Sequence, residues 1–172
     1  MSGQSSKDDI FIFIMRHGEA ESVLINDKDR QLTAQGCAEI DVTCNWLIEA
    51  YCHDRQLATV LVSPYKRTRQ SYQELANSLQ ASHFEICSDI TPDGNIKLAH
   101  DYIDVLAQQS LQSAEGRPLL VVSHMPFVSF LLDELCKTEQ MSLFSTGSVA
   151  VVRYSVSQRK GILEQHFQGC LR

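Results

Sequence analysis

The chain has 172 residues, 44% of them hydrophobic, and a formal net charge of −6 at pH 7. This length favours one domain with a full hydrophobic core, and the composition excludes a disordered chain. The negative charge argues against non-specific nucleic-acid binding, and no apolar run reaches the about 18 residues that span a membrane. We expect residues 1–9 to be a flexible N-terminal segment and residues 10–172 to form a single domain.

Cysteine usage points to the compartment in which the chain works. Six cysteines are present, at positions 37, 44, 52, 87, 136 and 170, and no Cys-x-x-Cys pair occurs. Most of them lie in apolar segments, as small core residues do. The first apolar run is too short for a signal peptide, and acidic residues precede it. We therefore predict reduced thiols and a cytoplasmic protein.

The first predicted strand is the apolar run Ile10–Met15, which is rich in β-branched and aromatic residues. It is too short for a helix core and reads as a strand that is buried on both faces. Arg16 and His17 follow directly, at the point where the strand leaves the sheet. Ligands bind outside the carboxyl ends of strands in open α/β sheets, so both residues are candidates for a functional site.

Residues 19–31 are polar and predict a loop with room for a short helix. Thr33 is the predicted N-cap of the helix that follows. Apolar residues then recur at three- and four-residue steps, which is the spacing of one helical face. This predicted core face consists of Cys37, Ile40, Cys44, Leu47, Ile48 and Tyr51.

Residues 57–62 predict a second strand, and the segment that follows predicts a helix. Ser63 at the N-cap and Pro64 at the first helical position would begin this helix, which we expect to reach about Leu79. Arg67 lies in the first turn. The free N–H groups and the dipole of a helix make a cation unfavourable there, so Arg67 is predicted to face an anion.

The second half of the chain continues the alternation of strands and helices. It contains a short predicted strand at 84–87, a turn at 91–95, a helix at 96–111 and a buried strand at 119–122. His124 follows this last strand, and Pro126 begins a helix. The side chains that this helix is expected to bury are Phe127, Phe130, Leu131 and Leu135.

Two closing strands, at 147–154 and 162–167, are joined by a short polar segment and predict an antiparallel hairpin. The order of elements predicts an α/β fold: a mostly parallel sheet with helices on both faces and an antiparallel edge. The strand ends that carry His17, Arg67 and His124 would then share one edge of the sheet. Guanidiniums bind phosphoryl oxygens, one imidazole can attack phosphorus, and a second can donate to the oxygens.

Four motifs resemble those of the histidine phosphatase superfamily, in its phosphoglycerate-mutase-like branch, and they span nearly the whole chain in the family's order. The motifs are Phe13-Ile14-Met15-Arg16-His17-Gly18-Glu19, Leu32-Thr33-x-x-Gly36, Ser63-Pro64-x-x-Arg67-x-x-Gln70 and Val122-Ser123-His124. The small size, Ile90-Thr91-Pro92-x-Gly94 and Ser-His-Met-Pro at 123–126 resemble the short phosphohistidine phosphatases of the SixA type.

This resemblance implies a three-layer α/β/α sandwich and a covalent phosphohistidine intermediate on His17. It implies that Arg16, Arg67 and His124 complete the phosphate pocket, with Arg30 as an additional anion contact and with no metal or cofactor. The expected substrate is a phosphorylated protein, such as a histidine phosphotransfer domain of a phosphorelay, and the expected product is inorganic phosphate. We expect neither nucleic acid nor membrane as a partner.

One departure from the larger members bears on the substrate. Those members carry an acidic general acid in an insertion after the third motif, and this chain has no room for it. Glu19, Asp89 and Asp93 are the nearest acids in the motifs, and none matches. A phosphohistidine has a better leaving group than a phosphoester, so the missing acid favours P–N cleavage. The alternatives are a small-molecule phosphomonoesterase or mutase of the same superfamily and a non-catalytic phosphate-binding module.

Overall fold

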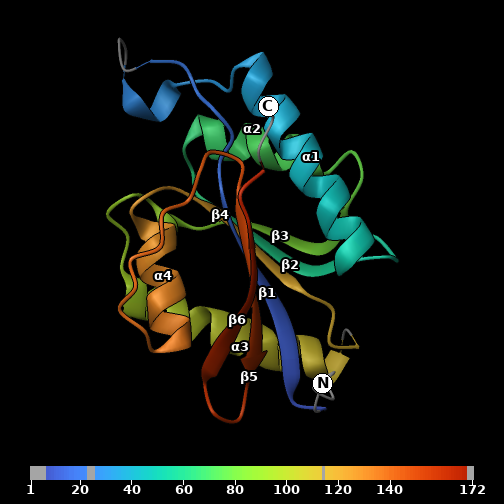
Figure 1. Ribbon diagram of the computed structural model, residues 1–172. Helices are drawn as coiled ribbons and strands as arrows, with labels where there is room; N and C mark the ends of the chain where they lie inside the picture. The colour runs from blue at the N-terminus through green and yellow to red at the C-terminus, as the bar shows by residue number, and fades with distance from the viewer. Residues whose placement is uncertain (1–6, 23–25, 114, 170–172) are drawn as a thin grey trace.

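A computed structural model describes residues 7–22, 26–113 and 115–169 of the chain. Its centre is a six-stranded sheet with the order β3-β2-β4-β1-β5-β6 (Figure 1). The strands are β1 (Asp9–Arg16), β2 (Gln56–Val62), β3 (Gln80–Ile86), β4 (Leu119–Ser123), β5 (Val149–Ser155) and β6 (Lys160–Phe167). β3, β2, β4 and β1 run parallel, while β5 and β6 form an antiparallel hairpin beside β1. The predicted mostly parallel sheet with an antiparallel edge is confirmed.

Four helices cover the two faces of the sheet, as the prediction of a three-layer sandwich requires. They are α1 (Ala34–Ala50), α2 (Lys66–Leu75), α3 (Ile96–Ser113) and α4 (Phe127–Cys136), and two short 3-10 helices, η1 (Asp27–Asp29) and η2 (Ser88–Ile90), lie in the loops. α1 and α2 pack together on one face, and α3 and α4 on the other (Figure 1). No described helix is long and apolar enough to cross a membrane.

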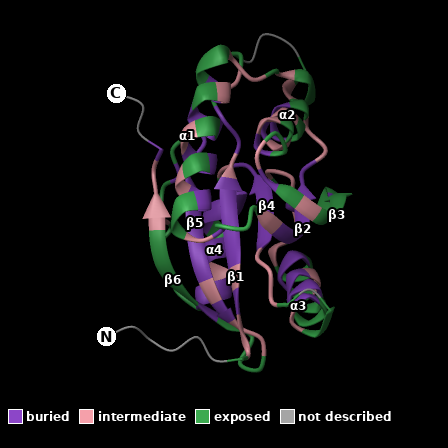
Figure 2. Ribbon diagram, turned by 90° about the vertical axis from the view of Figure 1, so that its right-hand side faces the viewer, coloured by how far each residue is buried: buried purple, intermediate pink, exposed green. Residues whose placement is uncertain are grey.

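β1 lies near the middle of the sheet and is buried on both faces, as predicted. Ile12 and Ile14 belong to the core under α3 and α4, whereas Phe13 and Met15 belong to the core under α1 and α2. All four side chains are fully buried. Figure 2 shows the same contrast across the sheet, with buried central strands and largely exposed edge strands β3 and β6.

Several boundaries differ from the prediction. The helix that Ser63 and Pro64 were expected to begin starts at Lys66, because the Ser63 hydroxyl contacts His124 instead of capping the helix. This helix ends at Leu75 rather than at Leu79. The short strand predicted at 84–87 is the longer β3, whose outward-facing side chains give it a weak apolar pattern.

The prediction that α4 buries Phe130 is wrong, since this side chain is 40% exposed. The face of α4 that packs on the sheet is centred on Val128, Leu131, Leu132 and Leu135, and Phe130 points away from it. The predicted N-cap of α1 is confirmed, because the Thr33 hydroxyl accepts a hydrogen bond from the Gly36 N–H at 3.0 Å.

The cysteines and the N-terminal segment were also the subject of predictions. Five cysteines, Cys37, Cys44, Cys52, Cys87 and Cys136, are free thiols, and residue 170 lies outside the described part of the chain. The flexible segment predicted for residues 1–9 lies mostly outside the described residues as well, and Asp9 is the first residue of β1.

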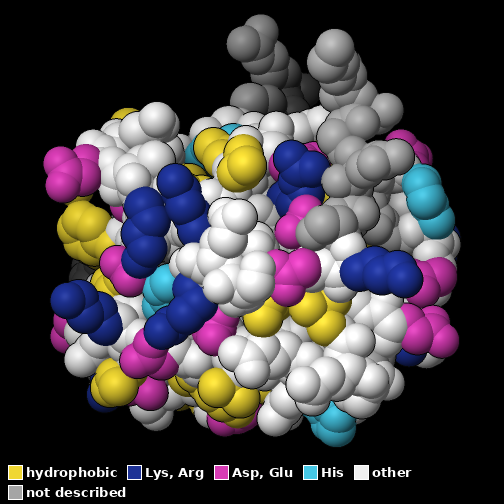
Figure 3. Space-filling model, turned by 90° about the horizontal axis from the view of Figure 1, so that it is seen from below, with side chains coloured by type: hydrophobic (Ala, Val, Ile, Leu, Met, Phe, Trp, Pro, Cys, Tyr) yellow, Lys and Arg dark blue, Asp and Glu magenta, His cyan; other side chains and the backbone are white. Residues whose placement is uncertain are grey.

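The surface away from the core carries charges of both signs. Exposed pairs such as Arg159–Asp101 and half-buried pairs such as Arg153–Glu164 place acidic and basic side chains next to each other. The face in Figure 3 likewise shows the two kinds of charge intermixed rather than a patch of one sign.

Candidate active site

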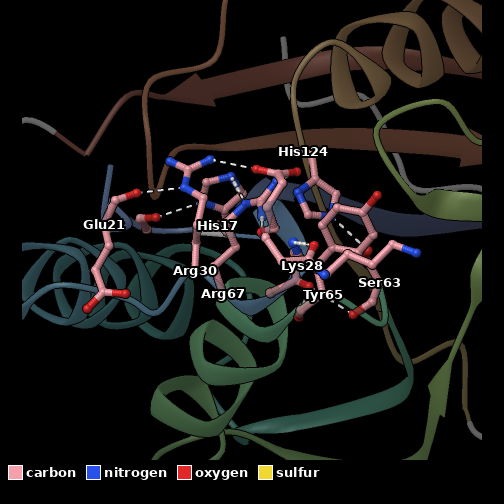
Figure 4. Close-up of polar contacts among 12 residues, drawn as sticks. His17, Glu21, Lys28, Arg30, Ser63, Tyr65, Arg67 and His124 are labelled. Carbon is pink, nitrogen blue, oxygen red and sulfur yellow. Dashed lines mark hydrogen bonds and ion pairs between the residues drawn. The ribbon is translucent and has the colours of Figure 1, made fainter. Parts of the chain in front are cut away.

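Three neighbouring parallel strands end together at one edge of the sheet. The backbone N–H of His17, just after β1, donates to the Ser123 carbonyl of β4 at 3.0 Å. The N–H of Ser63, just after β2, donates to the Val122 carbonyl at 3.1 Å. These bonds fix the three strand ends side by side, and Figure 4 shows the side chains of His17, Arg67 and His124 pointing toward one another. The strand ends singled out from the sequence therefore meet.

Two glycines allow the loop after β1 to lie directly on the first turn of α1. A Cβ atom on Gly18 would lie 2.4 Å from the Gly36 carbonyl oxygen, and one on Gly36 would lie 2.1 Å from the Glu19 carbonyl oxygen. Neither position has room for a larger residue. The Gly18 N–H also donates to the Ser71 hydroxyl of α2 at 3.1 Å. These contacts fix the backbone that carries His17.

Two hydrogen bonds determine which nitrogen of His17 carries the lone pair. Nδ1 lies 2.6 Å from the Gly18 carbonyl oxygen, which only accepts, so Nδ1 carries the hydrogen. Arg67 donates from Nε to Nε2 of His17 at 3.2 Å, so Nε2 is the acceptor. The lone pair of the imidazole is therefore on Nε2, where it accepts the hydrogen bond from Arg67, and this nitrogen is the candidate nucleophile.

Burial keeps the imidazole of His17 neutral. Loss of hydration above all, together with the nearby charges of Arg67 and Arg16, lowers its pKa to about 3, while the hydrogen bond to Gly18 opposes the shift. The side chain is 6% exposed. A neutral imidazole retains the lone pair that attack on phosphorus requires.

We expect the rings of His17 and His124 to stay neutral from pH 8 down to pH 5. Nitrogen-detected NMR of the histidine rings should then show two buried rings whose chemical shifts do not change across this range.

The low pKa of His17 also makes the free energy of unfolding depend on pH. Between pH 3 and the ordinary value of 6.5 the unfolded chain binds the proton that folded His17 does not, so the free energy of unfolding rises with pH. Protonation of both rings near pH 6.5 would contradict this account of the site.

His124 lies across the pocket from His17, with the two ring centres 5.3 Å apart. Its Nε2 contacts the Ser63 hydroxyl at 2.7 Å, whereas its Nδ1 is buried and has no hydrogen-bond partner among the described residues. Burial, followed by the influence of His17, lowers the pKa of His124 to about 2. If the Ser63 hydroxyl donates to Nε2, the ring carries its hydrogen on Nδ1, where it can donate to a phosphoryl oxygen.

Two arginines supply positive charge at this end of the sheet. Arg67 is 4% exposed, and burial lowers the pKa of its guanidinium, which nevertheless stays charged. Arg16 donates from Nη1 to the Phe144 carbonyl at 2.7 Å, and its Nε is buried with no partner in the described residues. The unpaired donors on Arg16 and His124 suit the oxygens of a bound anion.

Arg30 lies at the rim of the pocket, where it donates from Nη1 to Oδ1 of Asp27 at 3.0 Å and from Nε to the Glu21 carbonyl at 2.6 Å. Asp27 also contacts Arg67, so one carboxylate joins the two arginines. No sequence pattern singled out Asp27, because it lies in a polar loop without periodicity.

Tyr65 and Ser63 are further pocket residues that the sequence did not mark as functional. The ring of Tyr65 packs against His124 at 4.8 Å between centres, and the Arg67 guanidinium lies 5.0 Å from the ring centre. Lys28 approaches the same ring at 5.9 Å, which places a cation at the rim (Figure 4). The only sequence signal for these residues was that they lie inside the third motif.

None of the three acids weighed from the sequence forms a hydrogen bond or ion pair with the side chain of His17, Arg67 or His124 in the described part of the chain. Glu19 accepts a hydrogen bond from the Thr33 hydroxyl at 2.9 Å and so belongs to the cap of α1. Asp89 and Asp93 are exposed. Within residues 7–22, 26–113 and 115–169, no group of three His, Cys, Asp or Glu side chains is arranged to hold a metal ion.

The sequence of this chain is similar to those of known histidine phosphatases. The model of the histidine phosphatase superfamily, branch 1, matches residues 12–90. The chain is 35% identical to phosphohistidine phosphatase SixA of Escherichia coli strain K12 over 142 residues, which is 82% of this chain and 83% of the relative. It is 30% identical to a SixA homolog of Haemophilus influenzae over 159 residues, covering 90% and 94% of the two chains.

Solved structures give the same relationship. The structure of the protein histidine phosphatase SixA complexed with tungstate superposes with a TM-score of 0.83 at 32% sequence identity, covering 94% of this chain and 98% of the other. The structure of the alpha-ribazole phosphatase from Shigella flexneri shares the fold at 14% identity and a TM-score of 0.64, covering 95% of this chain and 98% of the other. With relatives above 30% identity over most of its length, the chain belongs to the histidine phosphatase superfamily.

Proposed function

We propose that this protein is a phosphohistidine phosphatase that works through a covalent phosphohistidine on His17. The observation that carries the proposal is the neutral imidazole of His17, whose Nε2 lone pair lies 3.2 Å from the guanidinium nitrogen of Arg67. A nucleophile next to a donor for phosphoryl oxygens is the arrangement that phosphoryl transfer needs. The SixA relatives, which are named as phosphohistidine phosphatases, support the same activity.

In this proposal the arginines and His124 hold the phosphoryl group. Arg16, Arg67 and Arg30 bind its oxygens, and Nδ1–H of His124 donates to one of them. Nε2 of His17 attacks phosphorus, and the bond from phosphorus to the substrate nitrogen breaks. The electron pair stays on that nitrogen, which takes a proton from solvent. Water then attacks the phosphorus on His17, the new P–N bond breaks, and inorganic phosphate and neutral His17 remain.

The surroundings of His17 favour a P–N substrate over an alcohol phosphate. An alkoxide leaving group needs a proton from a positioned acid, and such an acid typically contributes about 10²–10⁴-fold. Among the described residues, no hydrogen bond or ion pair joins Glu19, Asp89 or Asp93 to the side chain of His17, Arg67 or His124. An imidazole leaves more readily, so its departure depends less on a general acid. We extend the proposal to a protein substrate, such as a phosphorylated histidine phosphotransfer domain, because the name of the tungstate-bound relative describes a protein histidine phosphatase.

The test is phosphate release from a protein carrying phosphohistidine, measured beside a panel of sugar phosphates and other alcohol phosphates. We expect kcat/KM for phosphohistidine to exceed that for the esters by at least about 10²-fold, the usual contribution of a general acid. Equal turnover of sugar phosphates would favour a small-molecule phosphomonoesterase instead. Binding of phosphate without turnover of any substrate would favour the non-catalytic module.

A further inference from the structure

Asp27 has an unusual place among the pocket residues, since it is an acid in contact with the groups that should bind an anion. It is the first residue of η1, and its side chain is 44% exposed. Its Oδ1 lies 3.0 Å from Nη1 of Arg30, and its Oδ2 lies 3.3 Å from Nη2 of Arg67. Its backbone carbonyl accepts a further bond from Nη1 of Arg67 at 2.7 Å.

All three nitrogens of the Arg67 guanidinium are therefore engaged within the chain. Nε donates to the nucleophilic nitrogen of His17, and Nη1 and Nη2 donate to Asp27. A guanidinium has five N–H groups, so two on Arg67 stay unused, but the Asp27 carboxylate occupies a donor on Nη2 and places a negative charge beside any phosphoryl oxygen bound there. The carboxylate and a phosphoryl group therefore compete for the charge of Arg67 and Arg30.

Charge and exposure suit Asp27 to such an exchange. Partial burial acts to raise its pKa, but the hydrogen bond from Arg30 and the charge of Arg67 outweigh this and hold the pKa below its usual value. The carboxylate is therefore ionised at neutral pH. Because nearly half of its side chain is exposed, the carboxylate can turn into solvent when a ligand takes its place.

We propose that Asp27 is an internal competitor for the phosphate pocket, which occupies Arg67 and Arg30 in the free enzyme and is displaced by the phosphoryl group. The proposal rests on the function proposed above and adds a role in how the site releases its product. The bond from Nε of Arg67 to Nε2 of His17 does not involve Asp27. A phosphoryl oxygen that takes this donor in turn would free the lone pair of His17 for attack on phosphorus.

The free-energy cost of displacing Asp27 is the same for every phosphoryl ligand, but ligands differ in the contacts that can offset it. Inorganic phosphate makes only pocket contacts, so the cost of displacing Asp27 weakens its binding directly. A phosphorylated protein adds contacts outside the pocket that offset this cost. Asp27 would in this way limit inhibition by the product while leaving the protein substrate able to bind.

The test compares Asp27→Asn with Asp29→Asn. Both substitutions remove one negative charge from the same 3-10 turn, but Asp29 is exposed and makes no ion pair in the described part of the chain. The dissociation constant of inorganic phosphate is measured by calorimetry for both variants and the unmodified chain at one pH and one ionic strength. We expect Asp27→Asn to bind phosphate about tenfold more tightly, and Asp29→Asn to change by less than about twofold.

A supporting role for Asp27 in phosphate binding would change the phosphate affinity in the opposite direction. If Asp27 served to hold Arg67 in its binding position, its replacement would weaken phosphate binding, and that result would overturn the proposal. Unchanged binding, or equal tightening in both variants, would overturn it too. Asp27→Ala provides a second removal of the carboxylate and should tighten binding in the same direction.

This experiment keeps the two proposals separate. Calorimetry with phosphate needs no turnover, so a tighter Asp27→Asn variant supports the competitor even if the chain fails to hydrolyse phosphohistidine. With an active enzyme, the inhibition constant of phosphate should fall in parallel with its dissociation constant. An inhibition constant that stays unchanged in Asp27→Asn would contradict the role in product release.

Discussion

Replacement of His17 by alanine is expected to lower kcat/KM for phosphohistidine hydrolysis by at least about 10³-fold. The substitution removes Nε2, the atom that would form the covalent bond to phosphorus, and no other described histidine nitrogen accepts a hydrogen bond from Arg67. The phosphate-binding groups remain, since Arg16, Arg67 and His124 come from other positions. The variant should therefore still bind inorganic phosphate while it loses turnover.

The matched control for this variant is His83→Ala. His83 is an exposed residue of the edge strand β3, far along the sheet order from β1. We expect its replacement to change kcat/KM by less than about twofold, in line with surface substitutions elsewhere. Circular dichroism and the thermal midpoint of both variants show whether the fold is kept. Full activity in folded His17→Ala would end the role of His17 as nucleophile.

Replacement of Arg67 by lysine is expected to lower kcat/KM by about 10²–10³-fold, the cost of losing one preorganised donor to the transition state. Lysine keeps the positive charge but loses the planar fork that binds two oxygens at once. Its single ammonium also cannot replace the contact of Nε with His17 and at the same time offer two further nitrogens to phosphoryl oxygens. The loss should appear with phosphohistidine protein and with any small phosphoramidate alike.

Arg69→Lys is the control for this substitution. Arg69 is an exposed residue of the same helix, two positions further along α2, and the change of side chain is identical. We expect its kcat/KM to stay within about twofold of the unmodified enzyme. Equal losses in both variants would mean that Arg67 acts through general electrostatics and not through its contacts in the pocket.

The parts of the fold that were predictable from sequence are those with strong local patterns. The continuous apolar run of β1 could only be buried on both faces, and the hydroxyl of Thr33 before an apolar helix marked a true N-cap. The functional strand ends were predictable for a physical reason: parallel strands bring polar residues after each strand to one edge. His17, Arg67 and His124 follow this rule.

The features that were predicted wrongly or not at all depend on tertiary contacts or on how a helix is oriented against the sheet. Ser63 was expected to cap a helix, but its hydroxyl contacts His124, a residue 61 positions later. Phe130 fits the apolar spacing of α4 and is nevertheless exposed, because spacing alone cannot fix the centre of the buried face. The place of Asp27 in the site could not be predicted, because it depends on a contact with Arg67, which lies 40 positions away in the chain.

The covalent intermediate on His17 is the centre of this account, and trapping it is the most direct test. The enzyme is mixed with a protein carrying ³²P-labelled phosphohistidine, quenched in alkali within milliseconds, and digested for peptide mapping. We predict an acid-labile label on the peptide that contains His17, and no label in His17→Ala. Rapid release of phosphate with no labelled enzyme, or a label on any other residue, would contradict the account.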